Sequence, residues 1–591
     1  ITCPYCGKEI TEKEYEIDTA RQVVRIHCAD KKCYFGPGKQ RFLPVHLVDE
    51  EIYRQCPTVV IATVDKFAQL PWSEQVGLLF GKTDRFCPRH GFVAEGENHP
   101  QKHRKDIVLN LDATETQQHR PFYPPELIVQ DELHLITGPL GTIYGGYETV
   151  IEDLCTAEEK GKKIKPKYIV STATIRNAGE QLRALYARES YAQFPPDGFN
   201  SGDSFFVKGV PLPEKDVLNA SEEEVKNMDA KGEKPFRKYA GICAAGQSVK
   251  TTLTRLYAAI LQKTLELSET DEYRDYVDPY YTLIGYFNSI RELGGAVRLL
   301  DDDITARIDV LRRKHQALYG TPGAPFWKRI IYRKEEITSR MPSWKIAKTL
   351  ELLAIPFDPA AKYQQCYDVV IATNMIAVGM DVPRLGLMTV VGQPKQNAEY
   401  IQATSRVGRS RPGLIFTVYN PYRPRDLSNY ENFVGFHSQI YRYVEGTTAT
   451  PFAARARDRM LHALVISLLR LGYKDMATND DAHNLPELSD EDLNKVKKVI
   501  LDRVDIVEPG AHVETEQEID SFLGTWRDLC RDNEALVYHN RYKDTKPRLM
   551  HYYATEPPKG LKEVATLNSM RDVEQAARLF YYPEGGAGTD V

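Results

Sequence analysis

Two adjacent carboxylates, Asp131 and Glu132, follow an apolar run in the segment IVQDELH. Carboxylate oxygens are ligands that Mg²⁺ prefers, and a second acid beside the ion can orient or deprotonate an attacking water. We therefore expect Asp131 to hold a Mg²⁺ ion that bridges phosphate oxygens, and Glu132 to act on water. Acidic pairs at strand ends are common by chance, so this prediction depends on residues elsewhere in the chain.

Hydroxyl and amide side chains end several other apolar runs. The segment STAT, residues 171–174, follows YIV, and its hydroxyl groups are suited to relay the state of the acidic pair. Similar groups elsewhere are suited to binding the phosphates of a nucleic-acid strand. The residues predicted to do so are Thr63, Asn288, Ser289, Thr373 and Asn374.

A third group of residues is suited to the nucleotide itself. The segment YIQATSRVGRSRPG carries Gln402, Arg406 and Arg409. On a helix, arginines three apart share a face, so both are expected to point into one cleft and neutralise charge on a transferred phosphoryl group. The alternative for such a helix start is a solvated face. Gly379 and Asp381, in IATNMIAVGMDVP, lie on a loop that is predicted to contact the nucleotide ribose.

Four of the ten cysteines lie within the first 33 residues, spaced as Cys3-x2-Cys6-x21-Cys28-x4-Cys33. Two close thiolate pairs can surround one Zn²⁺ ion tetrahedrally, and the gap between them is long enough for a hairpin to return the chain. Their uneven placement suits a metal site in a reducing compartment better than a disulfide framework. We predict a structural zinc site here.

A second group contains Cys87, His90, His99 and His103. Its spacing is compatible with zinc ligation, but His99 and His103 lie in a polar stretch that is equally typical of a solvated loop. The sequence leaves both alternatives open.

From residue 57 onward, short β-rich runs alternate with helical patterns, which is typical of parallel strands with a site at their C-terminal ends. TVVIATV, LIVQ and YIVS form a first set, and YTLIGYF, YDVVIAT, LMTVVGQ and GLIFTVY form a second. The fold class is therefore α/β. The predicted regions are a zinc module at 1–45, the rest of a first α/β domain at 46–200, a linker or insertion at 201–245, a second α/β domain at 246–425, and a mainly helical region at 426–591.

Composition narrows the class of protein. The 591 residues are 42% hydrophobic and 27% charged, an ordinary globular mixture, and the formal net charge of −5 provides no global basic field for nucleic acid. No apolar run reaches the roughly 18 residues of a membrane span, and no signal segment opens the chain, so we expect a cytoplasmic protein without a membrane partner. Because the chain starts at Ile1, inside a cysteine pattern, we expect a piece of something longer.

The ordered set ATVDKFA, DELH, STAT, YFNS, IATNMIAVGMD and QATSRVGR resembles the motifs of superfamily two helicases. VQDELHLITGPLGTIYGGYE, TPFAARARDRMLHALVIS and TLNSMRDVE more narrowly resemble the DrmA family, the helicase subunits of the DISARM bacterial anti-phage systems. The resemblance implies two RecA-like domains with ATP in the cleft between them, DNA lying across both, and a DrmB-like partner subunit.

One part of an ATP site is missing from the sequence. A phosphate-binding loop needs glycines followed by Gly-Lys-Ser/Thr at a helix start, and the one candidate is LLFGKTD, with Gly81, Lys82 and Thr83. A phosphate loop has glycine five residues before the glycine of Gly-Lys-Ser/Thr, but here that residue is Val76. No helical pattern follows Thr83, so we predict a surface turn. The phosphate loop is expected upstream of Ile1, and the chain as given is expected to be inactive alone.

The leading hypothesis is an ATP-dependent DNA helicase or translocase in phage defence. A non-catalytic DNA-binding scaffold is the first alternative, although a clamp has no need of Glu132. An RNA helicase is the second, because motors of this type bind phosphates and the sugar contacts are not evident from the residues.

Overall fold

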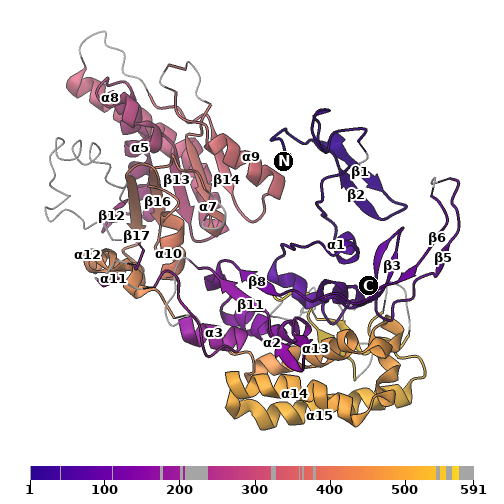
Figure 1. Ribbon diagram of the computed structural model, residues 1–591. Coiled ribbons are helices and arrows are strands. Elements are labelled where there is room, and N and C mark those ends of the chain that lie inside the picture. Colours follow the sequence, from indigo (N-terminus) through magenta and orange to yellow (C-terminus); the bar gives the residue numbers. More distant parts are fainter. Residues whose placement is uncertain are drawn as a thin grey trace, which may run out of the picture. The chain divides into compact units, whose positions relative to one another are not determined.

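The computed structural model describes residues 2–39, 41–108, 111–172, 178–196, 198–199, 204–206, 237–320, 328–358, 360–361, 365–376, 381–446, 448–540, 546–553 and 562–571. The chain folds into two compact units (Figure 1). The first comprises Ile1–Thr172, Asn177–Ala192 and Thr447–Val591, and the second contains Gln193–Gly446. Among the described residues, no helix has the length and apolar character needed to cross a membrane.

A six-stranded sheet forms the centre of the second unit, and all of its neighbouring strands are parallel. The order is β12-β17-β16-β13-β15-β14. The strands are β12 (Arg237–Cys243), β13 (Leu283–Phe287), β14 (Lys334–Ile337), β15 (Val369–Ala372), β16 (Leu387–Val391) and β17 (Gly413–Tyr419). This sheet confirms the α/β class predicted from the sequence.

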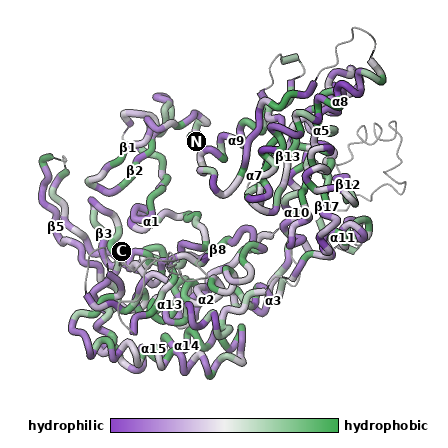
Figure 2. The backbone as a smooth tube through the Cα atoms, turned by 180° about the vertical axis from the view of Figure 1, so that it is seen from behind, coloured by the Kyte–Doolittle hydropathy of each residue, from purple (hydrophilic) through white to green (hydrophobic). Residues whose placement is uncertain are grey.

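Helices cover both faces of this sheet, which explains the continuous apolar runs of its central strands (Figure 2). On β13, Leu283 and Phe287 join a core with α5 and α7, whereas Ile284 and Tyr286 join a core with α9 and α10. The helices are α5 (Val249–Ser268), α6 (Asp278–Tyr281), α7 (Ile290–Leu299), α8 (Thr305–Tyr319), α9 (Ser343–Leu353), α10 (Asn397–Thr404), α11 (Pro424–Glu431) and α12 (Phe433–Ser438).

The described part of the first unit combines small antiparallel sheets with two parallel strand pairs, β8 with β11 and β18 with β19. Its strands are β1 (Tyr15–Asp18), β2 (Val23–Ile26), β3 (Thr83–Cys87), β4 (Gly91–Ala94), β5 (Lys102–His103), β6 (Thr114–Glu115), β7 (Gln117–Gln118), β8 (Leu127–Gln130), β9 (Ala157–Glu159), β10 (Lys162–Ile164), β11 (Lys167–Val170), β18 (Met550–Tyr552) and β19 (Val564–Thr566). Its helices are α1 (Asp49–Gln55), α2 (Gly138–Leu154), α3 (Ala178–Tyr186), α13 (Ala454–Gly472), α14 (Asp490–Val507) and α15 (His512–Asp532).

The sequence suggested a strand at TVVIATV, but the structure assigns none to residues 57–62, so this prediction is wrong. Val59 and Ile61 are 75% and 94% exposed. A strand needs a neighbour to accept and donate its backbone hydrogen bonds. In the described part of the chain, β8 pairs only with β11, and no strand lies against residues 57–62.

Residues from the two ends of the chain share the core of the first unit, where α2 packs against α13. At Gly146 a Cβ atom would lie 2.1 Å from Met460 Cε, so any larger residue would require the Met460 side chain to move. Arg470 of α13 donates to Pro71 O at 3.0 Å, which ties the helix to the early part of the chain. The segment after residue 447 therefore supports the residues that carry the DELH motif.

Glu148 on α2 lies fully buried, and the hydroxyl of Tyr168 on β11 donates to its Oε1. Burial raises the pKa of Glu148 to about 7, against the attraction of the Arg503 guanidinium. This buried acid thus contacts β11, whose pairing with β8 ends just before Asp131 and Ser171.

Glu148→Gln should make the protein more stable at high pH. Because the folded-state pKa is raised, the native state holds a proton that the unfolded state loses, so stability falls as pH rises from about 4.5 to about 7. The penalty is complete above that range and amounts to roughly 3 kcal/mol at most. Urea denaturation at about pH 5 and about pH 8 should show a much larger variant advantage at the higher pH. An equal advantage at both, or one shared by the exposed control Glu158→Gln, would contradict this assignment.

Candidate functional site at the ends of parallel strands

The DELH and STAT segments meet because β8 and β11 are parallel neighbours that end together. Gln130 pairs with Val170, the last residue of each strand. Ser171 N donates to Gln130 O at 2.9 Å, and Leu133 N donates to Ser171 O at 3.0 Å. These bonds carry the pairing past the strand ends and place Asp131 and Glu132 beside Ser171.

Hydrogen bonds orient the carboxylate of Asp131. The Ser171 hydroxyl donates to its Oδ1, and the backbone N–H of Glu132 donates to the same oxygen at 2.9 Å. Within the described residues, Oδ2 makes no hydrogen bond, and the side chain is exposed. The carboxylate is thus held by one oxygen and presents the other, an arrangement suited to a divalent cation.

Glu132 is held by a residue to which the sequence assigned no role. His134 Nδ1 lies 3.3 Å from Glu132 Oε2 and 3.3 Å from the hydroxyl oxygen of Thr172. The His134 side chain is buried, at 5% exposure. The position of His134, two residues after Glu132 in DELH, is the sequence feature that could have identified it. Each acid of the pair therefore connects with one hydroxyl residue of STAT.

In the second unit, the predicted nucleic-acid residues follow two adjacent strands. Thr373 and Asn374 come directly after β15, and Asn288 and Ser289 come directly after β13. Thr373 is buried and its N–H donates to Ile337 O at 3.3 Å, whereas Asn374 is exposed. The carboxyl ends of parallel strands share one edge of a sheet, so these residues lie along the same edge.

Asn288 and Ser289 already have structural contacts. Asn288 Nδ2 donates to Gly392 O at 2.8 Å and to Val391 O at 3.1 Å, which uses both of its amide hydrogens. Ser289 Oγ accepts from Glu292 N at 3.2 Å and caps α7. Ser289 keeps its hydroxyl hydrogen for another acceptor, but Asn288 has no remaining donor. Phosphate binding by Ser289 stays a prediction, whereas the side-chain amide of Asn288 is already occupied.

The two arginines do not lie on a helix, as the sequence suggested. α10 contains the buried Gln402 and ends at Thr404, so Arg406 and Arg409 follow it in a turn. Gly408 has φ +72°, a conformation that other residues rarely adopt, and this ends the helical path before β17. The shared-face prediction is therefore wrong.

Arg409 contacts the residue predicted to act beside it. Its Nη1 donates to Asp381 Oδ1, and its Nε donates to Ser405 O at 3.3 Å. Both side chains are partly exposed, at 32% for Arg409 and 66% for Asp381. Gly379 lies outside the described residues. The structure thus joins two of the predicted nucleotide residues in an ion pair at the surface of the second unit.

Two further predicted segments lie in the first unit. Thr63 is exposed and precedes the short helix Val64–Gln69. Gly81, with φ +80°, directly follows a second short helix, Glu74–Phe80. Thr83 begins β3, and its hydroxyl donates to Val93 O at 2.7 Å. A strand rather than a helix follows Lys82, so LLFGKTD lacks the geometry of a phosphate loop. The turn is largely buried, not at the surface as predicted.

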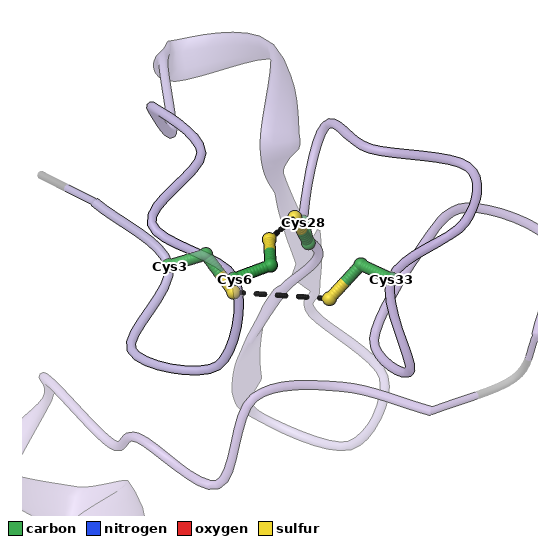
Figure 3. A group of neighbouring side chains, drawn as sticks. All are labelled: Cys3, Cys6, Cys28 and Cys33. Carbon is green, nitrogen blue, oxygen red and sulfur yellow. Dashed lines mark hydrogen bonds between the residues drawn. The ribbon is translucent and has the colours of Figure 1, made fainter.

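The four N-terminal cysteines converge (Figure 3). Cys3 Sγ lies 3.9 Å from Cys33 Sγ, Cys6 Sγ lies 3.4 Å from Cys28 Sγ, and all four sulfurs lie within 4.8 Å of one another. Tetrahedral zinc thiolates, with Zn–S near 2.3 Å, have sulfurs about 3.8 Å apart. The hairpin of β1 and β2 returns the chain between the pairs, as the spacing predicted. These four residues fit a zinc ion.

Comparisons with known proteins find similarity to helicases. A family model described as the helicase conserved C-terminal domain matches residues 356–411. The "DISARM protein DrmA" of Bacillus paralicheniformis is 49% identical over 592 residues, covering 98% of this chain and 49% of that protein. The chain therefore spans about half the length of this relative. Nucleolar RNA helicase 2-B of Xenopus laevis is 34% identical over 73 residues, covering 12% of this chain and 9% of that protein.

Two solved structures also show similarity. The DUF1998 helicase MrfA bound to DNA and AMPPNP has a TM-score of 0.39 at 13% identity, covering 73% of this chain and 42% of that chain. The Mycobacterium smegmatis helicase Lhr bound to ssDNA and AMP-PNP has a TM-score of 0.33 at 16% identity, covering 68% of this chain and 38% of that chain.

Backbone geometry at Glu132 gives a test of strain at this site. Glu132 has φ +52°, in the left-handed region. Glycine adopts that region without penalty, whereas a residue with a Cβ pays roughly 1 kcal/mol. Glu132→Gly should therefore be more stable than Glu132→Ala by about that amount in urea denaturation. At Gln130, in the strand, the order should reverse, with alanine the more stable. Alanine more stable than glycine at both positions would show that Glu132 is unstrained.

Proposed function

Because this chain is a DrmA-like member of superfamily two, we propose that it forms the motor part of an ATP-dependent DNA helicase or translocase in a bacterial anti-phage complex. The observation that carries the proposal is the edge where β8 and β11 end, with an oriented Asp131, Glu132 beside His134, and two hydroxyl residues within contact. An acid pair with this support is what phosphoryl transfer to water requires.

The two acids would have different tasks. Asp131 would hold the Mg²⁺ that accompanies ATP, and the ion would supply charge neutralisation at the phosphate oxygens. Glu132, with Oε2 beside His134, would orient the attacking water and accept its proton at Oε1. The Ser171 hydroxyl would keep the Asp131 carboxylate in position, and the Thr172 hydroxyl would hold His134, which contacts Glu132. Both hydroxyls would respond to changes in the two acids.

Residues of the second unit would bind the nucleotide as well. Arg409, held by Asp381, would exchange this exposed ion pair for the transferred phosphoryl group, with Arg406 beside it in the chain. Gln402 and Gly379 complete the set that the motif resemblance implies. Exposed ion pairs contribute little stability, so the exchange costs little.

Nucleic acid would be bound through its backbone, independently of sequence. Thr373, Asn374, Ser289 and Thr63 would donate to phosphates. We propose a different task for Asn288, because its amide hydrogens are bound to Val391 and Gly392. It would hold the end of β16 in place and position its neighbours at the edge of the sheet.

We also propose a phosphate loop outside this chain, a partner subunit and DNA as the polynucleotide. No segment of the 591-residue sequence has the full spacing of a phosphate loop, so this chain alone should hydrolyse ATP poorly. A DrmB-like subunit is the proposed partner, and DNA is the proposed polynucleotide. An RNA helicase or a non-catalytic DNA scaffold would be distinguished by the nucleic acid that stimulates hydrolysis, or by the absence of hydrolysis. We further propose that Cys3, Cys6, Cys28 and Cys33 hold a structural zinc ion.

Glu132→Gln should separate binding from hydrolysis in a longer chain that includes a phosphate loop. Glutamine keeps the shape but cannot accept a proton, so turnover should fall ~10² to 10⁴ fold while ATP and DNA binding persist. Steady-state hydrolysis and equilibrium binding measure the two effects. Glu126→Gln, at an exposed site just before β8, is the matched control. Normal turnover by Glu132→Gln would remove this residue from the mechanism.

Arg409→Ala should lower turnover by ~10³ to 10⁵ in the same longer chain, as loss of an arginine that neutralises transferred phosphoryl charge does elsewhere. Asp381→Asn should have a smaller effect, because it releases the guanidinium without removing it. Arg423→Ala breaks a surface ion pair with Glu292 and serves as the control. If Arg409→Ala and Arg423→Ala lower turnover equally, Arg409 only forms a surface ion pair and does not act on the nucleotide.

A further inference from the structure

Cys87, His90, His99 and His103 form a second compact cluster in the first unit. Cys87 Sγ lies 3.7 Å from His90 Nδ1, and His90 Nδ1 lies 3.1 Å from His99 Nε2. The imidazole ring of His103 is centred 4.8 Å from that of His90 and 5.1 Å from that of His99. One ligand atom from each residue lies within 4.8 Å of every other.

Three separate pieces of chain supply the four residues. Cys87 ends β3 and His90 lies in the turn to β4, which begins at Gly91. His99 lies in the loop that follows, and His103 is on β5, where it pairs with Thr114 of β6. A polar, solvated loop would have no reason to bring these side chains together.

The distances match those of a tetrahedral zinc ion. With Zn–N near 2.0–2.1 Å and Zn–S near 2.3 Å, two nitrogen ligands lie about 3.3 Å apart, and a nitrogen and a sulfur lie about 3.6 Å apart. The observed separations are 3.1 Å and 3.7 Å. The cluster therefore has the size of a coordination shell.

The remaining ring nitrogens support the same arrangement. His99 Nδ1 lies 3.1 Å from Pro100 O, so its proton is bound there and Nε2 presents a lone pair toward His90. Bonds of this kind fix the tautomer of metal-binding histidines. His103 Nε2 is buried and has no hydrogen-bond partner among the described residues, which is costly unless another group occupies that position.

A cluster held together only by hydrogen bonds explains fewer of these contacts than a zinc ion does. A single proton between His90 and His99 would satisfy that pair, but it would leave His103 Nε2 without a partner among the described residues.

We propose that Cys87, His90, His99 and His103 bind one Zn²⁺ ion. One thiolate and three imidazoles form a ligand set that suits zinc and fills all four positions, so the site is structural and has no place for a substrate. The ion would join the β3–β4 turn, the loop at His99 and the base of the β5–β6 ribbon. This inference is independent of the proposed ATPase activity.

Zinc content of the purified protein tests the proposal. Elemental analysis should find two zinc ions per chain in the unmodified protein, one in the four-cysteine site and one here. His99→Ala should lose one ion, Cys28→Ser should lose the other, and the double variant should lose both. His119→Ala removes an exposed histidine that contacts Phe92 in the same module and should keep both ions.

X-ray absorption at the zinc edge of the unmodified protein gives a measurement that does not depend on variants folding. Two occupied sites should give an average shell derived from five thiolates and three imidazoles. A shell of sulfur alone, or a zinc content unchanged by His99→Ala, would overturn the proposal. One ion lost by His99→Ala and kept by Cys28→Ser would uphold it while removing zinc from the other site.

Discussion

The parallel pairing of β8 with β11 is the constraint on which the candidate site depends. Because Gln130 and Val170 are register partners, Asp131 and Ser171 leave the two strands at the same edge, and a hydroxyl reaches a carboxylate. The helix α2, packed tightly on α13 at Gly146, supports this pair from below. The C-terminal segment that contains α13 thus helps to hold Asp131, Glu132, Ser171 and Thr172 in place.

Metal clusters would stabilise the parts of the first unit with little apolar core. The core of the N-terminal module consists of six buried residues, three of them cysteines that converge on one point. The β5–β6 ribbon has even less support, and His103 lies at its base. In small modules of this kind, metal binding supplies much of the folding free energy. Zinc would therefore hold the surfaces of the unit in place without taking part in chemistry.

Sequence patterns predicted the parts of the fold that local periodicity and spacing determine. The buried strands of the second unit, the hairpin between the cysteine pairs and the ends of β8 and β11 were expected from their residues. Contacts between distant segments were not, since His134 with Thr172 and Arg409 with Asp381 depend on tertiary packing. Residues 57–62 carry a strand pattern without a neighbour, and Gly408 ends a helical path that the spacing of Arg406 and Arg409 had suggested. Local sequence patterns predicted these two segments wrongly, because their secondary structure depends on the backbone contacts that the rest of the fold provides.

We propose above that Asp131 and Glu132 belong to an ATPase that acts on DNA. The most direct measurement is the rate of ATP hydrolysis by a longer chain with a phosphate loop, with single-stranded DNA, duplex DNA, RNA or no nucleic acid added. We expect Mg²⁺-dependent hydrolysis that DNA stimulates. Absence of hydrolysis under every condition, or stimulation by RNA alone, would contradict it.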